Sequence, residues 1–128
     1  MERGKITITE NDVIINSIDE NIWLSSYEIA KLFDVFLAKI TSNIRSILKS
    51  DVFWKNDVCF CYHYSNGNSV DLYNFEMITA LAFRIDSPKA DVFRKWLMKQ
   101  VSVKRKNEPE TKVAPTLIVF DATNRINC

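Results

Sequence analysis

Five polar side chains in the segment 38–49 have types and a spacing suited to binding phosphate. They are Lys39, Ser42, Arg45, Ser46 and Lys49. On a helix they share one side with small neighbours, and that side has three basic residues and no acid. Lysine and arginine neutralise phosphate, and small residues let a helix approach DNA closely. The pattern favours a nucleic-acid-binding surface, although the solvated face of an ordinary helical hairpin has a similar pattern.

A second group, Cys59, Cys61 and His63, resembles a set of metal ligands. These residues would share one face of a strand, with neighbours roughly 6.6 Å apart. That separation is too large for adjacent ligands of one tetrahedral ion unless the strand bulges. Zinc motifs instead place two residues between cysteines. We therefore expect a half-buried cysteine face and no metal site.

Other catalytic patterns are weak. His63 is the only histidine, and Gly4 and Gly67 are the only glycines, which excludes a glycine-rich phosphate loop. We expect no enzyme activity, no catalytic residue, no cofactor and no small-molecule substrate. A nuclease is the least favoured function, because no carboxylate cluster has metal-binding spacing.

Two arginines lie in the predicted C-terminal helices: Arg84 near the end of the first and Arg94 in the second. One of them could contact phosphate. The favoured interpretation is structural, with each arginine between packed helices and paired with an acid such as Asp86 or Glu76.

Composition indicates one globular domain. The chain has 128 residues, is 47% hydrophobic and has a net charge of +1, which excludes a disordered chain and a strongly basic coat. Three cysteines without framework spacing are expected to be free thiols. No segment resembles a signal peptide or a membrane span, so we expect a cytoplasmic protein without a membrane partner.

A helix-turn-helix is predicted over residues 22–48. Ser25 or Ser26 caps the first helix, and Glu28 has the capping-box spacing from Ser25. Asp34 occupies the turn, where it can adopt a left-handed conformation. The second helix runs from about Leu37 to Lys49, with a buried stripe made by Leu37, Ile40, Ile44, Ile47 and Leu48.

The remaining elements are two hairpins and two further helices. Residues 5–16 and 58–73 form the hairpins, the second turning at Asn66-Gly67, with Phe53 and Trp54 packed on the core before it. Asn74 caps a helix that ends at Ile85, and Ser87-Pro88 starts a helix that reaches about Val103. A domain of residues 1–104 is thus followed by a linker and a short strand, Leu117–Phe120, in residues 105–128.

Residues 21–104 resemble the RhuM virulence-protein family of bacteria. Three segments carry the resemblance: residues 23–33 with Ile40, Ile44 and Ile47, residues 73–78, and residues 83–97. The resemblance implies DNA binding by a helix-turn-helix, often on mobile elements. Asp34 replaces a glycine of the family pattern, and Phe36-Leu37-Ala38-Lys39 replaces a polar start of the second helix.

Together these observations predict an α+β fold with a winged helix-turn-helix-like core. The expected function is DNA binding by a transcriptional or mobile-element regulator, with the second helix in the major groove. Asn66 and Asn68 would contact DNA from the wing, and pairing of Leu117–Phe120 would supply a homodimer. The alternative is a protein-interaction module that docks through Phe36 and Leu37.

Overall fold

The computed structural model describes residues 3–16 and 21–106, with side chains as far as residue 102. The chain divides into two compact units, Met1–Leu97 and Met98–Cys128. The first unit contains every described element apart from the C-terminal part of the last helix. The predicted boundary after residue 104 stays a prediction, and the predicted strand Leu117–Phe120 lies outside the described residues.

The first hairpin is confirmed. Strand β1 (Lys5–Ile8) pairs antiparallel with β2 (Val13–Asn16), with Lys5 opposite Asn16. Alternation places Ile6 and Ile8 in the core and leaves Lys5 exposed. The hairpin thus covers one side of the helix that follows it, which it contacts through β1.

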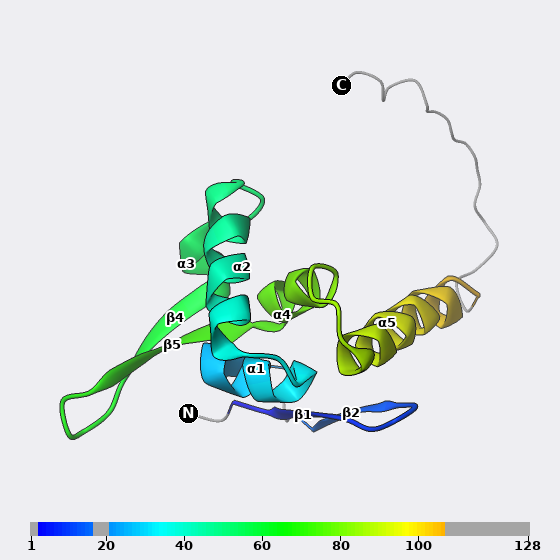
Figure 1. The fold of residues 1–128 in the computed structure, drawn as a ribbon, viewed down its shortest axis with the longest axis horizontal. Helices are drawn as coiled ribbons and strands as arrows, with labels where there is room; N and C mark the ends of the chain where they lie inside the picture. Colours follow the sequence, from blue (N-terminus) through cyan, green and yellow to red (C-terminus); the bar gives the residue numbers. More distant parts are fainter. Residues whose placement is uncertain (1–2, 17–20, 107–128) are drawn as a thin grey trace, which may run out of the picture. The chain divides into compact units, whose positions relative to one another are not determined.

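The predicted pair of helices is also confirmed. Helix α1 (Ser26–Phe33) begins at a complete capping box, in which the Glu28 amide donates to Ser25 Oγ over 3.2 Å and the Ser25 amide donates to Glu28 Oε1 over 2.9 Å. Its C-cap is Asp34, which has the left-handed φ of 59°. Helix α2 (Leu37–Lys49) then packs on α1, on the side away from β1 (Figure 1).

Three strands form a second antiparallel sheet. Its order is β3 (Trp23–Ser25), β5 (Ser69–Asn74) and β4 (Cys59–His63). The hairpin β4–β5 was predicted, and Gly67 supplies the positive φ of 93° in its turn. Strand β3 and the single-turn helix α3 (Lys55–Val58) were not predicted. Because β3 directly precedes α1, it ties the start of the helix pair to the hairpin that follows it.

Two helices complete the described chain, α4 (Phe75–Ala82) and α5 (Pro88–Lys106). Asn74 caps α4 as predicted, since its side chain accepts from the Met77 amide over 3.1 Å. Helix α4 ends at Ala82, so its predicted end at Ile85 is wrong. No helix in the described part of the chain is both long enough and apolar enough to cross a membrane.

The core lies where α1, α2 and α4 meet the first residues of α5. Its largest fully buried side chains include Phe33, Phe93, Ile29, Ile40 and Met77. Two predicted core positions are wrong: Leu37 is 44% exposed and Trp54 is 80% exposed. Phe53 does pack against the core. With its helices and two antiparallel sheets, the structure has the predicted mixed α+β class.

Candidate nucleic-acid interface

Helix α2 has two sharply different faces. Ile40, Ile44 and Ile47 are buried against the core, at spacings of four and three residues that keep them on one stripe. The polar side chains predicted as a binding face lie on the opposite side of the helix. All five of them are exposed: Lys39, Ser42, Arg45, Ser46 and Lys49. The structure thus brings the predicted residues together on one accessible surface, here named the α2 face.

The composition of the α2 face makes it cationic. Helix α2 contains no aspartate or glutamate. The ion pairs found among the described residues join Arg3 to Glu28 and Asp91 to both Arg94 and Lys95, so they leave Lys39, Arg45 and Lys49 unneutralised. Lys49 also lies in the last turn of α2, where the helix dipole favours a positive charge.

A fourth cation joins this surface from another element. Arg84, in the connection between α4 and α5, donates from Nη1 to Ser46 Oγ over 3.1 Å. The two residues are 38 positions apart, and both are exposed. Arg84 was predicted to pair with an acid or to contact phosphate. No acid is paired with Arg84 among the described residues, and the observed bond places its guanidinium beside α2, where it adds charge to the predicted face.

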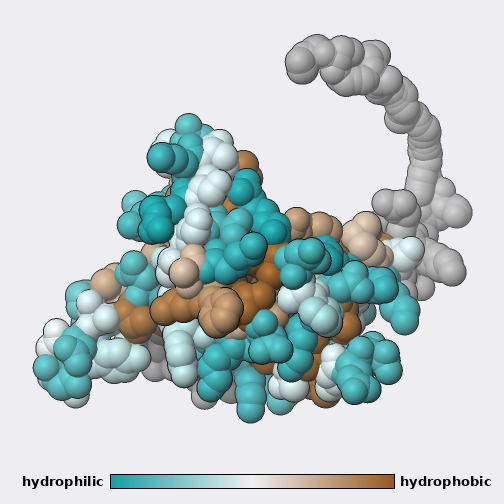
Figure 2. Space-filling view, viewed as in Figure 1, coloured by the Kyte–Doolittle hydropathy of each residue, from teal (hydrophilic) through white to brown (hydrophobic). Residues whose placement is uncertain are grey.

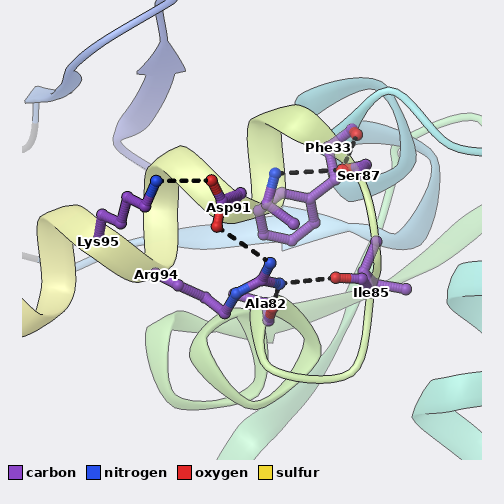
Figure 3. A network of polar contacts seen from close by, with 8 residues as sticks. Phe33, Ala82, Ile85, Ser87, Asp91, Arg94 and Lys95 are labelled. Atoms are coloured by element: carbon purple, nitrogen blue, oxygen red, sulfur yellow. Dashed lines mark hydrogen bonds and ion pairs between the residues drawn. The ribbon is translucent and has the colours of Figure 1, made fainter.

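The position of Arg84 depends on a polar network under the α4–α5 connection (Figure 3). Arg94 Nη1 donates to the carbonyl oxygens of Ala82 and Ile85 over 2.6 and 2.7 Å. The first bond satisfies the carbonyl of the last residue of α4, which has no helical partner, and the second binds a carbonyl of the connection itself. Arg94 is structural as predicted, but its acidic partner is Asp91, over 3.5 Å, and not Asp86 or Glu76.

Ser87 links the same connection to α1. Its hydroxyl accepts from the Ala90 amide over 3.1 Å, as a cap of α5, and donates to the carbonyl oxygen of Phe33 over 2.8 Å. Ser87 is buried, with 8% of its surface exposed. The bond therefore holds the end of α1 against the start of α5, and Figure 3 shows both bonds beside the Arg94 contacts.

An ion pair secures the start of α1. Arg3 donates from Nη1 and Nη2 to the two carboxylate oxygens of Glu28, over 2.6 and 2.9 Å, and from Nη1 to the Trp23 carbonyl over 3.3 Å. Burial by itself raises the pKa of Glu28, but the hydrogen bonds from Arg3 and the Ser25 amide outweigh it and hold that pKa below its ordinary value.

The predicted wing residues lie apart from α2. Asn66 and Asn68 are exposed in the turn between β4 and β5, where Asn66 Oδ1 accepts from the Asn68 amide over 3.0 Å. Figure 1 shows this turn at the free end of the hairpin, away from α2. The structure therefore does not place Asn66 and Asn68 on the α2 face.

Strand β4 contains two of the three cysteines that were predicted to be free thiols, and both are free. Cys59 is half-buried, and burial raises the pKa of its thiol, which disfavours the nucleophilic thiolate. Burial likewise raises the pKa of neighbouring Tyr73 to about 12. Cys61 is exposed. The part of the chain that the structure describes contains no group of three or more His, Cys, Asp or Glu side chains placed to hold a metal ion.

Apolar side chains stand at the start of α2. Phe36 is 87% exposed and Leu37 is 44% exposed. Figure 2 shows that the part of α2 facing the viewer is otherwise mostly hydrophilic or neutral, with apolar surface gathered below it.

Comparisons with protein-family models, with curated proteins and with solved structures give no match for this chain.

Proposed function

We propose that this chain binds duplex DNA through the α2 face and has no catalytic activity. Helix α2 would lie in the major groove, with Lys39, Arg45 and Lys49 nearest the phosphates. Ser42 and Ser46 would add hydrogen bonds to the backbone. The cellular role would be regulation of transcription or of a mobile element.

One observation carries this proposal. The five residues predicted to bind phosphate are all exposed on one face of α2, a helix without any acid. The hydrogen bond from Arg84 to Ser46 adds a further cation from outside the helix. A helix face that is only solvated usually has charges of both signs, and it does not require an arginine from another part of the chain beside it.

We further propose that the helix pair is a winged helix-turn-helix. The order of elements supports this: β3 precedes α1 and α2, the hairpin β4–β5 follows them, and β3 pairs with β5. Asn66 and Asn68, at the tip of that hairpin, would reach the backbone beside the groove. Membership of the RhuM family stays a prediction.

A second candidate function is docking of a protein partner through the start of α2. The exposure of Phe36 and Leu37 favours it, because large apolar side chains gain free energy when a partner covers them. This candidate requires binding to survive high salt, whereas phosphate contacts weaken as salt rises.

Titration of labelled duplex DNA at low salt tests the main proposal. We expect Arg45→Ala and Lys49→Ala each to weaken binding, because each removes one phosphate contact. Lys5→Ala is the matched control: it removes the same charge from an exposed position on β1, which packs against α1. Binding that is absent, or equally weakened by all three substitutions, would refute a specific role for the α2 face.

The oligomeric state belongs to the same proposal. One module of this size makes few phosphate contacts, so useful affinity calls for two copies on adjacent half-sites. The segment predicted to pair them, Leu117–Phe120, lies outside the described residues. Sedimentation of the full chain with and without DNA would show whether two copies bind together.

A further inference from the structure

Phe36, immediately before α2, has a side chain that neither helix capping nor core packing explains. Phe36 is the N-cap of α2, a position where serine, threonine, aspartate or asparagine is preferred because the side chain can accept a hydrogen bond. Phe36 makes no such bond. It does not pack on the core either, since 87% of its surface is exposed. This side chain is therefore free to contact a partner.

One exposed stripe of α2 begins with a small apolar residue, Ala38, and continues into the cationic face. Ala38, Ser42, Arg45 and Lys49 follow one another at spacings of four, three and four residues, so they form a single stripe of the helix. All four are exposed. Ala38 is about 16 Å from Lys49 along the helix axis. A partner that covers this stripe meets the Ala38 methyl group at one end and two basic side chains further along, so an apolar group followed by negative charge would suit it.

Duplex DNA has this combination in its major groove. The thymine C5-methyl group is the apolar feature there, and phosphates border the groove on both sides. A recognition helix contacts base edges with its N-terminal residues, while its other residues can reach the backbone. The order along α2 is the same, with apolar residues first and most of the basic residues later.

The polar alternatives for reading bases are limited on this helix. Adenine is read by asparagine or glutamine, and Asn43 is the only such residue in α2. Its side-chain amide donates to the Lys39 carbonyl oxygen over 2.8 Å, so it is engaged by its own helix. Arg45, which could read guanine, lies more than two turns after Phe36. Lys39 in the first turn could read guanine and Ser42 is unselective, so Phe36 and Ala38 are the residues near the base edges that can select thymine.

We infer that Phe36 and Ala38 contact thymine methyl groups, so that the preferred target contains A·T pairs opposite the start of α2. This inference rests on the proposed DNA binding and names what the same helix would recognise. Phe36 supplies most of the contact area, and Ala38 allows close approach. Lys39, Arg45 and Lys49 hold the helix on the backbone without selecting the base.

The test removes the methyl groups from the DNA and leaves its charge unchanged. A labelled A·T-rich duplex is compared with the same duplex in which deoxyuridine replaces every thymidine. The full chain and its Phe36→Ala variant are titrated against both at low salt. Ile14→Ala is the matched control, because Ile14 is a 50% exposed apolar residue on the β1–β2 hairpin.

We expect the unaltered chain and the Ile14→Ala variant to bind the deoxyuridine duplex about fourfold more weakly for each methyl group contacted. The Phe36→Ala variant should lose most of this difference and keep only the part that the Ala38 contact supplies. Measurable but equal binding of the unaltered chain to both duplexes would overturn the inference and leave the proposed function standing. An equal loss for Phe36→Ala on both duplexes would also overturn it, and absence of binding to either duplex would overturn both.

Discussion

At the scale of single residues, Glu28 combines two structural roles. Its carboxylate closes the capping box of α1 by accepting from the Ser25 amide over 2.9 Å, and it pairs with both terminal nitrogens of Arg3. The first role concerns neighbours in the chain, and the second ties the residues before β1 to α1. Because a carboxylate accepts all three hydrogen bonds, protonation would weaken them together.

Glu28→Gln should therefore lower the free energy of unfolding in a pH-dependent way. The pKa of Glu28 is lowered in the folded chain, so the stabilisation is present above the ordinary value of 4.5 and is lost as the pH falls through the folded-state pKa. About a third of each side chain is exposed, so water limits the pair to less than about 1 kcal/mol. Denaturant unfolding from about pH 7 to about pH 3 measures the difference.

Glutamine retains an oxygen for the capping box, so this substitution mainly removes the charge. Arg3→Gln serves as the second variant and should remove the same pH-dependent part. A difference between wild type and Glu28→Gln that stays constant across this pH range would contradict the role of the ion pair.

At the scale of elements, the turn between α1 and α2 depends on the backbone of Asp34. Its φ of 59° and ψ of 51° are left-handed, a conformation that costs most residues roughly 1–2 kcal/mol but costs aspartate less and glycine least. The Val35 amide donates to the Ala30 carbonyl over 3.0 Å across this turn. The angle between the two helices therefore rests on a conformation that few residues adopt readily.

We predict that Asp34→Ala lowers the free energy of unfolding by about 1 kcal/mol, whereas Asp34→Gly leaves it unchanged or raises it slightly. The side chain of Asp34 is exposed, so the two substitutions differ chiefly in their backbone preference. Denaturant titration of both variants checks this. A glycine variant less stable than the alanine variant would be inconsistent with this account of the turn.

The connection between α4 and α5 depends on the guanidinium of Arg94. Arg94→Lys keeps the charge but loses the planar group that reaches both carbonyl oxygens, so we expect a loss of about 1–3 kcal/mol. Lys95→Ala is the matched control, because Lys95 pairs with the same Asp91 but is 77% exposed. Its loss should be below about 0.5 kcal/mol. Equal losses in thermal unfolding would show that Arg94 has no special role.

Local patterns in the sequence predicted most elements of this fold. Ser25 and Glu28 located the start of α1, and Asn66-Gly67 located the turn of the second hairpin. Strand β3 was missed because three residues are too few to show alternation, and because its partner β5 lies far along the chain. The end of α4 was predicted too late because Phe83 continues the apolar pattern. The carbonyl oxygens at this end are bound by Arg94, which lies on another helix and gives no signal in the local sequence.

The candidate site was predictable only where one helix supplies it. The residue spacing within α2 was enough to predict that five polar residues share one face of the helix. Each of them is exposed, as that prediction requires. The bond from Arg84 to Ser46 joins residues 38 positions apart and has no local signal. Exposure of Trp54 and Leu37 was likewise not predictable, because an apolar residue type does not reveal whether the surrounding chain covers it.

At the scale of the whole molecule, charge is distributed unevenly. The net charge is only +1, so the chain lacks the strong overall field that draws basic proteins to nucleic acid. The α2 face and Arg84 nevertheless gather four cations without an acid in the helix. Affinity for a polyanion at this surface should therefore respond strongly to salt.

The salt dependence of binding to duplex DNA tests this claim most directly. If Lys39, Arg45, Lys49 and Arg84 each neutralise one phosphate, the logarithm of the binding constant should fall with the logarithm of salt concentration with a slope of about −3.6 per bound copy. Replacing both Arg45 and Lys49 by alanine should reduce that slope by about two. An unchanged slope in the double variant, or no binding by the unaltered chain at low salt, would contradict the account.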